Sequence, residues 1–573
     1  MGDQNTTLSP RDRESHPRSS WVDSYPPHVP SAIELKDHSS ICGYFEHAVK
    51  KYADRPAITC LGQSFTYAAL NQQTRSFAAW LQSLGLPTGA RVALMLPSGI
   101  QYVVAMFGVL RAGYVVVNVN PMYTARELTH QLNDSGAESI IVLEQFASTF
   151  QQVRAGVRIK HVIVVTMGDL FGWLKGHAIN FAIRRLRKDV PAWSLPGHHS
   201  FSKAIANGKS MALHEVTLQQ TDLAMLQYTG GTTGVAKGAM LLHRNLLAAS
   251  TIAGTWLNVA LQTEPAISRP VMVLPLPLYH IFTIYTLMVG FGAGACSVLI
   301  PNPRDVDSLV KTMRAQRFHL MFGLNTLYNA LLNHPEGKQV DYSTCRAFVA
   351  GGTATQQPVA EAWHRLTGRW IVEGWGMTET TGAGTCNPPH RDEFNGSIGL
   401  PLPSVTISIR DDDGRELPAG SVGEICISGP QVMAGYWQRP DETQQVLGSD
   451  GFLKTGDVGV MDAQGYVRVV DRKKDMILVS GFNVYPAEIE EVAMSLAGVL
   501  EAAAVGVPSE STGESVKLFV VRKDARLTVE QVRSHCAMNL TNYKRPQRIV
   551  FVDSLPKSPV GKVLRRELRD YQH

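Results

Sequence analysis

The stretch that most constrains this chain is residues 228–238, which read Tyr-Thr-Gly-Gly-Thr-Thr-Gly-Val-Ala-Lys-Gly. The apolar run before it indicates a buried strand, and the run that begins at Ala239 indicates a second strand leading into a helix. Four glycines and three threonines in eleven residues suit a loop that wraps an anion. Glycine lets backbone N–H groups approach phosphate oxygens, while the hydroxyls and Lys237 add donors and charge. We therefore predict a phosphate-binding loop; an ordinary flexible loop is the alternative.

A P-loop is the obvious rival, and the sequence argues against it. That motif requires Gly-Lys followed directly by Ser or Thr, whereas Lys237 is followed by Gly238. The stretch instead resembles, nearly residue for residue, the phosphate loop of the adenylate-forming superfamily of acyl-CoA synthetases, carrier-loading adenylation domains and beetle luciferases. The resemblance implies that these residues bind the nucleotide: Thr229, Gly230, Gly231, Thr232, Thr233, Gly234 and Lys237.

Composition narrows the class of protein. The length of 573 residues, with 44% hydrophobic and 18% charged residues, predicts a globular chain of two or more domains. The net charge of +5 is small for this size, and no recognition motif indicates nucleic-acid binding. The seven cysteines form no Cys-x-x-Cys pair, so neither zinc nor a disulfide framework is indicated, and a reducing, cytoplasmic setting fits best.

Two segments raise the questions of whether part of the chain is disordered and whether part of it spans a membrane. Residues 1–35 are polar and lack the apolar centre of a signal peptide, so we expect a disordered leader. Residues 271–300 carry no formally charged side chain and are long enough to span a bilayer. Pro275, Pro277 and three glycines divide this run, which favours a buried strand, a turn and a helix pair over a membrane span.

The first third of the chain alternates strands and helices. We predict a hairpin over 57–67, a helix from about Tyr67, strands at 91–96 and 114–119 around a helix at 101–112, and further strands at 139–142 and 161–165. Strands alternating with helices of this length imply a parallel sheet covered on both faces.

Residues 168–190 interleave apolar and basic side chains. The apolar members are Phe171, Trp173, Leu174, Ile179, Phe181, Ile183 and Leu186, and the basic members are Lys175, Arg184, Arg185, Arg187 and Lys188. A basic amphipathic helix of this kind can lie on an anionic membrane surface. A surface helix packed on the body explains the same pattern, and charge patterning alone does not separate the two. Gly172 and Gly176 weaken the helix prediction.

Further motifs carry the resemblance through the middle of the chain. It implies that His280, in a Pro-Leu-Tyr-His-Ile-Phe segment, lies beside the acyl and adenylate site, with Phe282 and Tyr285 as candidates to close an acyl tunnel. It also implies that Gly351 and Gly352, which follow an apolar strand, form one wall of the adenine pocket. Taken singly, a core histidine and a glycine turn explain these residues equally well.

The stretch Glu-Gly-Trp-Gly-Met-Thr-Glu at 373–379 resembles the next superfamily motif, with Trp375 where tyrosine is usual. An indole offers a larger face for stacking adenine, so this departure is conservative. The resemblance implies that Trp375 and Gly376 contact the nucleotide and that Thr378 binds the α-phosphate. It implies that Glu379 holds Mg²⁺, a hard cation that prefers oxygen ligands shared with phosphates, and that Thr229 is the second metal contact.

The last motifs lie in the C-terminal third. The resemblance implies that Asp457 accepts hydrogen bonds from the ribose hydroxyls, that Arg472 also lies at the ribose, and that Lys474 is the hinge between two domains. Gly481 would shape the channel for the pantetheine arm of coenzyme A. Lys562 follows a loop that contains Pro and Gly, from which a long cationic side chain could reach a distant site; by resemblance it is the catalytic lysine, beside Thr378, Glu379 and His280.

The resemblance covers about residues 40–570 and is greatest to bacterial long-chain fatty acid–CoA ligases, notably at 432–440 and 479–486. It implies an α/β fold with a large N-terminal domain over 36–472, including a distorted β-barrel, and a small mobile α/β domain over 473–573. The implied reaction activates a fatty acid with ATP and Mg²⁺ as an acyl-adenylate, then forms the coenzyme A thioester and releases AMP and pyrophosphate.

Three alternatives stay open at this point. An enzyme that loads a carrier-protein thiol shares every nucleotide motif, and a medium-chain or aryl acid would differ only in pocket shape. A membrane-embedded binding or transport protein would depend on residues 271–300. The expected partners are a long-chain fatty acid and, at the inner face of the cytoplasmic membrane, a peripheral lipid contact. No nucleic acid is expected, and a homodimer is left open.

Overall fold

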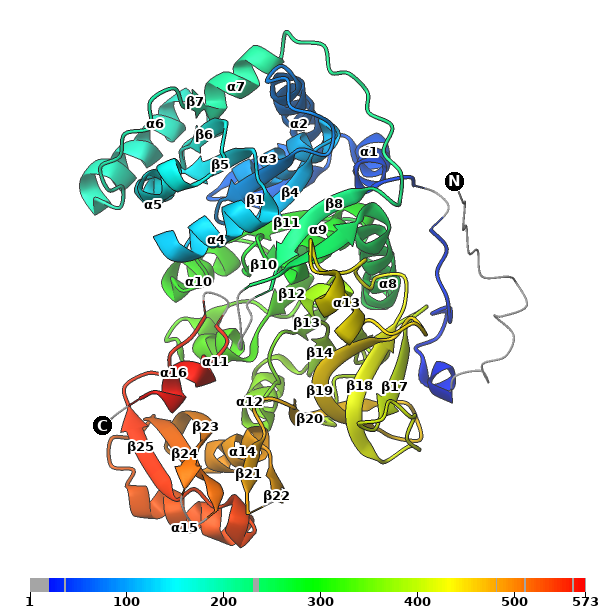
Figure 1. Cartoon of the computed structure of the whole chain (residues 1–573), viewed down its shortest axis with the longest axis vertical. Coiled ribbons are helices and arrows are strands. Elements are labelled where there is room, and N and C mark those ends of the chain that lie inside the picture. The colour runs from blue at the N-terminus through cyan, green and yellow to red at the C-terminus, as the bar shows by residue number, and fades with distance from the viewer. Residues whose placement is uncertain are drawn as a thin grey trace.

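Two mostly parallel sheets carry the large N-terminal part of the chain in the computed structural model (Figure 1). The structure describes residues 20–35, 38–229, 236–480, 482–509, 512–558 and 561–571. The C-terminal residues form a separate, smaller unit with its own sheet, drawn in orange and red in Figure 1. The predicted α/β fold with a large and a small domain is confirmed.

The first large sheet has seven strands, parallel except for its last strand, which is antiparallel to its neighbour. Its order is β7 (His199–Ser200), β6 (His161–Val165), β5 (Ser139–Leu143), β3 (Arg91–Met95), β4 (Val115–Asn118), β8 (Leu223–Tyr228) and β9 (Gly238–Leu242). The helices between these strands are α3 (Ile100–Arg111), α4 (Ala125–Ser135), α5 (Ala147–Val153), α6 (Trp173–Phe181) and α7 (Phe201–Gly208). The predicted alternation of strand and helix is confirmed over this region.

The second large sheet has nine strands. Its order is β16 (Leu400–Pro401), β15 (Thr385–Cys386), β14 (Ile371–Trp375), β13 (Ala347–Ala350), β12 (Leu320–Gly323), β10 (Val271–Leu274), β11 (Cys296–Leu299), β1 (Pro56–Cys60) and β2 (Gln63–Thr66). Its helices are α8 (His243–Gln262), α9 (Ile281–Gly292), α10 (Val306–Arg314), α11 (Asn325–Asn333) and α12 (Gln357–Thr367), and α1 (Ile41–Tyr52) and α2 (Tyr67–Gln82) flank the predicted β1–β2 hairpin, which is confirmed.

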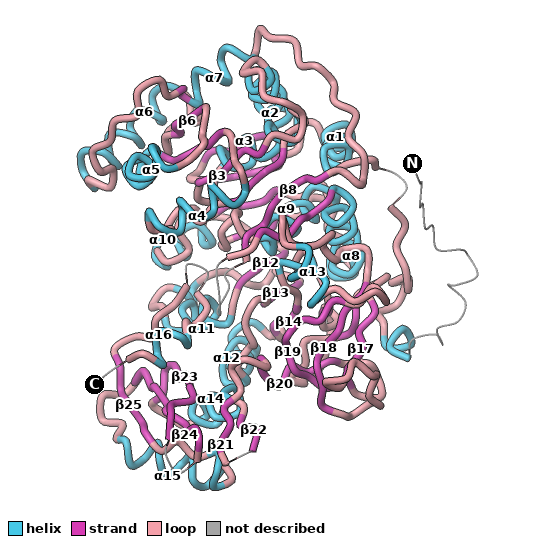
Figure 2. Tube along the Cα trace, viewed as in Figure 1, coloured by secondary structure: helices cyan, strands magenta, loops and turns pink. Residues whose placement is uncertain are grey.

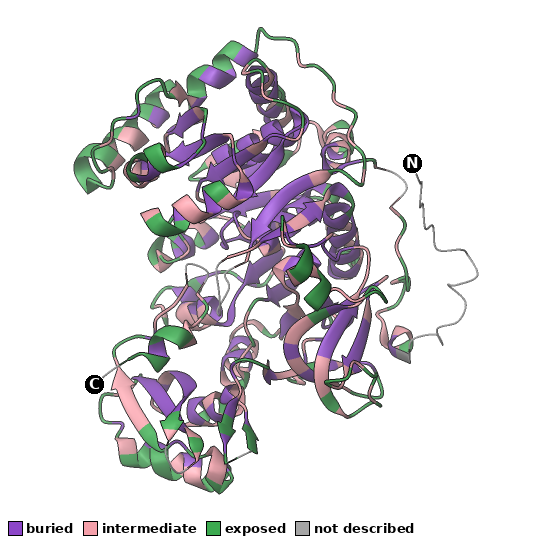
Figure 3. Cartoon of the chain, viewed as in Figure 1, coloured by how far each residue is buried: buried purple, intermediate pink, exposed green. Residues whose placement is uncertain are grey.

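The main core lies between these two sheets. Alternate residues of a strand point to opposite faces, and Val92 and Leu94 of β3 join the central cluster while Ala93 and Met95 face the cluster under α4 and α5. Met272 and Leu274 of β10 join the same central cluster, whereas the opposite face packs under α10, α11 and α12. Every residue of α3 is buried between the layers, in keeping with the buried interior in Figure 3.

A four-stranded antiparallel sheet follows, in the order β17 (Thr406–Arg410), β18 (Val422–Ser428), β19 (Leu453–Met461) and β20 (Val467–Arg472), with α13 (Pro440–Val446) before β19. A distorted β-barrel is expected somewhere in the large domain. The pairing of the described strands of this four-stranded sheet is an open path, and a bridge between Gly399 and Val467 joins its edge to the loop before β16.

The small unit has a five-stranded sheet of β22 (Phe482–Val484), β21 (Ile477–Val479), β24 (Gly513–Arg522), β23 (Val499–Ser509) and β25 (Arg548–Val552). Two helices, α14 (Pro486–Ser495) and α15 (Val529–Asn539), cover one face, and α16 (Arg565–Arg569) packs on the other (Figure 2).

The predicted disordered leader is wrong for residues 20–35. Trp21, in a short 3-10 helix over Ser20–Ser24, is buried against Gly465. The Tyr25 hydroxyl donates to the Pro401 carbonyl at 2.5 Å, and the Ile33 amide donates to Ser404 Oγ at 2.9 Å. Trp21 joins the main core and Val22, Tyr25, Val29, Ile33 and Leu35 pack against it, an apolar group that the composition of 1–35 as a whole did not reveal. Residues 1–19 lie outside the described residues.

Residues 271–300 form β10, a turn, the single buried helix α9 and β11. The expected buried strand and turn are confirmed, but the predicted helix pair is wrong because the second piece extends as β11 beside β10. None of the helices that the structure describes combines the length and hydropathy needed to cross a bilayer.

Candidate active site

The candidate site lies where the ends of β8, β13 and β14 meet the small unit. Thr229 follows β8, Gly351 and Gly352 follow β13, and Gly376 follows β14. A Cβ on Gly376 would lie 2.3 Å from the carbonyl oxygen of Gly382, so only glycine lets these two backbones come so close. The loops after parallel strands thus form a backbone-lined cradle, the kind of surface that binds phosphates and a flat base.

The flanks of the predicted phosphate loop are well defined. The Thr229 amide donates to the Lys237 carbonyl at 2.9 Å, which closes the loop at its base. Gly230, Gly231, Thr232, Thr233 and Gly234 lie outside the described residues. The Lys237 ammonium pairs with the Glu442 carboxylate and lies 5.0 Å from the centre of the Tyr436 ring. In this structure Lys237 is therefore held by a carboxylate at the rim of the site.

Glu379 is buried in a short 3-10 helix over Thr378–Thr380. Its Oε1 accepts a hydrogen bond from the Tyr436 hydroxyl at 2.7 Å, and its carbonyl accepts one from the Met433 amide at 2.8 Å. Burial, with the nearby Glu379 charge, raises the pKa of Tyr436 far above its usual value, so this hydroxyl stays a donor. The carboxylate is thereby oriented before any ligand arrives.

Lys562 extends from the small unit into the site of the large one. Its Cε and Nζ lie 3.5 and 3.9 Å from where a Cβ on Gly352 would stand. Desolvation of the ammonium, and then the charge of Arg472, lower the pKa of Lys562 to about 8, although the carboxylates of Asp457 and Glu379 oppose the shift. The Lys562 residue is exposed overall.

His280 stands immediately before α9, and its Nε2 is buried with no hydrogen-bond partner among the described residues. Burial, with a smaller contribution from the Lys562 charge, lowers the pKa of His280 to about 3. The ring is therefore neutral near pH 7. A buried polar atom without a partner costs free energy unless a ligand satisfies it, so His280 fits the edge of a binding site. Phe282, on the same helix, lies 3.2 Å from a Cβ built on Gly351.

Asp457 on β19 is buried and pairs with two groups. Its Oδ1 lies 3.0 Å from Arg472 Nε on β20, and its Oδ2 accepts a hydrogen bond from Trp375 Nε1 at 2.9 Å. Lys474 lies just beyond, and burial and the Arg472 charge lower its pKa. Gly481 lies outside the described residues.

The structure brings the central predicted residues together in one region: His280, Gly351, Gly352, Trp375, Gly376, Thr378, Glu379, Asp457, Arg472, Lys474 and Lys562. Tyr436 and Glu442 contact site residues but are missing from the sequence prediction. Their segment resembles the superfamily, yet no local chemistry indicates that it reaches Glu379 and Lys237. Among the residues that the structure describes, no three His, Cys, Asp or Glu side chains could hold a metal by themselves. Mg²⁺ at Glu379 would therefore take its remaining ligands from phosphates and water, as it usually does.

Fold and site together define a protein of a large and a small unit, with a glycine-lined cradle in the large unit and a lysine of the small unit beside it. The family model described as "AMP-binding enzyme" matches residues 45–437, and the model "AMP-binding enzyme C-terminal domain" matches residues 488–562. The chain belongs to this family of AMP-binding enzymes, which confirms the predicted superfamily.

The chain is similar to proteins named long-chain-fatty-acid–CoA ligase. It is 49% identical over 552 residues to the one from Escherichia coli O6:H1, covering 96% of this chain and 98% of the relative. It is 46% identical over 556 residues to the one from Haemophilus influenzae, covering 96% and 98%. Among solved structures, ATP-bound MatB from Rhodopseudomonas palustris is 30% identical, with a TM-score of 0.75 and coverage of 92% of this chain and 98% of that chain.

The pKa of Lys562 makes a testable prediction. Because this pKa is about 8, the ammonium loses its charge as pH rises through 8. We therefore expect kcat/KM for ATP, measured by pyrophosphate exchange in the presence of a carboxylic acid substrate, to fall over the same pH range. kcat/KM reports the groups of the free enzyme. Lys562→Arg keeps its charge at every working pH, so its profile should stay level to higher pH even if its activity is lower. The same fall in both proteins would show that the charge of Lys562 does not cause the pH dependence.

Proposed function

We propose that this chain is an AMP-forming long-chain fatty acid–CoA ligase. The observation that carries the proposal is the placement of the Lys562 ammonium beside Gly352, with Glu379 and Asp457 near enough to act on its pKa. The near full-length similarity to long-chain-fatty-acid–CoA ligases supports the substrate class. ATP, Mg²⁺ and coenzyme A are the substrates and metal of this reaction.

The chemistry explains why cations gather in the cleft. A carboxylate is a poor acyl donor, because its leaving group would be an oxide. Attack of the fatty acid carboxylate on the α-phosphate of ATP forms an acyl-adenylate and releases pyrophosphate. This step brings two anions together, so the site must present positive charge and fixed donors where negative charge develops. Lys562, with Arg472 and the amides of the glycine-lined cradle, supplies them.

Each residue has a role in this proposal. Thr229, Lys237 and the loop between them bind the β- and γ-phosphates, and Thr378 binds the α-phosphate. Nucleotide binding exchanges the Glu442 carboxylate at Lys237 for phosphate. Glu379 and Thr229 would hold Mg²⁺, which would neutralise phosphate charge. Trp375 stacks on adenine, with Gly351 and Gly352 as the opposite wall, and Asp457 accepts the ribose hydroxyls.

The second step needs another arrangement of the two domains. We take residues 36–472 as the adenylate-forming domain and 473–573 as the mobile domain, with Lys474 as the pivot. Rotation would withdraw Lys562 and bring Gly481 to the channel through which the thiol of coenzyme A attacks the acyl-adenylate and displaces AMP. Such a hinge closure lets one cleft serve two reactions.

A product assay tests the substrate class and its alternatives. Given ATP, Mg²⁺, free coenzyme A and a C16 fatty acid, we expect AMP, pyrophosphate and the acyl-CoA. ADP as the nucleotide product would contradict the mechanism. A holo carrier protein preferred to free coenzyme A would favour the loading enzyme, and higher kcat/KM for benzoate or octanoate would favour the aryl or medium-chain alternative.

The two half-reactions separate the roles of Lys562 and Gly481. Lys562→Ala should lower the rate of acyl-adenylate formation on the order of 100- to 1,000-fold, the usual cost of removing one preorganised charge-stabilising group. Conversion of supplied acyl-adenylate to acyl-CoA should be nearly unchanged, since Lys562 would by then lie away from the site. Gly481→Leu should do the opposite. Equal slowing of both half-reactions by Lys562→Ala would contradict the rotation.

A second, independent proposal concerns the lipid partner. The helix α6 and the π-helix over Ala182–Arg187 expose four apolar side chains: Trp173 (74%), Leu174 (75%), Phe181 (59%) and Leu186 (72%). Phe171 is buried instead, so the expected amphipathic helix packs only part of its apolar side on the body. Arg185, Arg187 and Lys188 are exposed beside these residues, whereas Arg184 pairs with buried Glu144. Exposed apolar and aromatic side chains with cations in the same segment suit the surface of an anionic bilayer, here the inner face of the cytoplasmic membrane.

Vesicle binding tests this surface. Replacing Arg185, Arg187 and Lys188 by Gln should weaken binding to phosphatidylglycerol vesicles by roughly 100-fold at low salt, since each basic residue near such a surface contributes about 1 kcal/mol. Arg184 is left in place because its loss would leave the buried Glu144 carboxylate without its cationic partner. The control replaces the exposed residues Lys311, Arg317 and Lys338, which changes the net charge equally outside the patch. Equal binding by both triple variants would favour a surface helix with no lipid role.

A further inference from the structure

The hydrogen bond between Trp375 and Asp457 joins two different sheets at the candidate nucleotide site. Trp375 ends β14 of the nine-stranded sheet, and Asp457 lies on β19 of the four-stranded sheet. The indole Nε1–H donates to Asp457 Oδ2 at 2.9 Å, while Arg472 Nε lies 3.0 Å from Oδ1. The carboxylate is buried, so these two neighbours fix the plane in which it stands.

The contact leaves the carboxylate free to accept more hydrogen bonds. An ionised carboxylate has about four acceptor positions, and one donor on each oxygen leaves one position on each. Indole N–H and guanidinium are donors only, so neither partner competes as an acceptor. The pair Trp375 and Arg472 thus turns Asp457 into an oriented acceptor for two further donors, such as the adjacent hydroxyls of a ribose.

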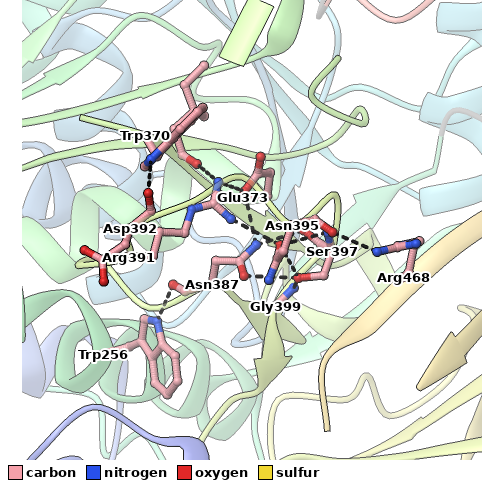
Figure 4. A network of polar contacts seen from close by, with 11 residues as sticks. Trp256, Trp370, Glu373, Asn387, Arg391, Asp392, Asn395, Ser397, Gly399 and Arg468 are labelled. Atoms are coloured by element: carbon pink, nitrogen blue, oxygen red, sulfur yellow. Dashed lines mark hydrogen bonds and ion pairs between the residues drawn. The ribbon is translucent and has the colours of Figure 1, made fainter. Parts of the chain in front are cut away.

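The ring of Trp375 cannot easily leave this position. A Cβ on Gly384 would lie 2.8 Å from the Trp375 ring, so the β14–β15 pair packs directly against the indole. The strand behind it is anchored by the polar network in Figure 4. There the backbone amide of Asn387 donates to the backbone carbonyl of Glu373 at 2.8 Å, and the Glu373 carboxylate pairs with Arg391 at 2.6 Å.

We propose that Trp375 is a positioning residue for ribose recognition: its indole N–H holds the Asp457 carboxylate in the orientation that accepts the sugar hydroxyls of the nucleotide. The inference rests on the proposed role of Asp457 as the ribose ligand. It gives Trp375 a task besides stacking on adenine, and the two tasks respond to different changes in the nucleotide. Stacking senses the base, whereas the oriented carboxylate senses the hydroxyls.

The test compares Trp375→Phe with the wild-type chain on ATP, 2′-deoxyATP and 3′-deoxyATP. The variant keeps an aromatic face and removes the N–H. We expect wild type to prefer ATP, because a buried carboxylate is left short of a donor when a hydroxyl is missing. In Trp375→Phe the preference for ATP over at least one deoxynucleotide should shrink by about 3- to 10-fold. This corresponds to losing part of the free energy of a hydrogen bond to a charged group when the carboxylate is poorly oriented.

Two readouts are measured on the full chain. The first is kcat/KM in fatty acid-dependent pyrophosphate exchange, and the second is the dissociation constant of each nucleotide by calorimetry without fatty acid. An equal loss for all three nucleotides, or an unchanged preference, would overturn the proposal, since a stacking or purely structural role would act on them alike. If the chain fails to activate fatty acids at all, the proposed function falls, while the binding ratios still decide the role of Trp375.

Trp370 supplies a matched control. Its indole Nε1–H also donates to an oxygen at 2.9 Å, the carbonyl of Asp392, and it precedes β14 directly (Figure 4). Trp370→Phe removes an equivalent hydrogen bond outside the site, so its nucleotide preference should equal that of wild type. A reduced preference in Trp370→Phe as large as in Trp375→Phe would assign the effect to loosening of the β14 region and would overturn the proposal. Thermal unfolding of both variants checks that they are folded.

Discussion

The segment from Ala434 to Glu442 holds the site together, because it bonds to parts of both large sheets at once. Its backbone pairs antiparallel with β9: the Met240 amide donates to the Gly435 carbonyl at 2.8 Å, and the Trp437 amide donates to the Gly238 carbonyl at 2.8 Å. Its side chains reach Glu379, through Tyr436, and Lys237, through Glu442. The base of the phosphate loop and the carboxylate after β14 are therefore placed by one piece of chain, although they belong to different sheets.

Charge explains why the small domain can stand where it does. Desolvation and the charge of Arg472 lower the pKa of both Lys562 and Lys474, whereas the carboxylates of Asp457 and Glu379 oppose both shifts and Asp475 opposes that of Lys474. Like charges crowded together in a partly desolvated space destabilise that arrangement until an anion joins it. A triphosphate supplies that anion, so nucleotide binding and the placement of Lys562 should favour each other. Consumption of the triphosphate would remove the same support and would favour the change of domain orientation proposed between the two steps.

Much of this protein could be predicted from local sequence. The alternating strands and helices and the β1–β2 hairpin follow from periodicity, and the choice of His280, Glu379 and Asp457 follows from the resemblance to the superfamily motifs. The failures are also local in origin. The leader over 1–35 is polar as a whole, but Trp21 packs against Gly465, and Tyr25 packs against Trp256 and bonds to the Pro401 carbonyl, all more than 200 residues away. Composition reports the average of a segment, whereas docking depends on a few side chains.

The sequence by itself determined the kind of chemistry: glycines and threonines for an anion, a carboxylate for a hard cation, and a lysine on a loop. Only the tertiary structure decided which of these groups meet, since Trp375 and Asp457 are 82 positions apart and Tyr436 and Glu379 are 57 apart. It also decided that Trp173 and Leu174 stay exposed while Phe171 is buried. The physical reason is that strand pairing and side-chain packing set these distances, and a motif carries information only about its own few residues.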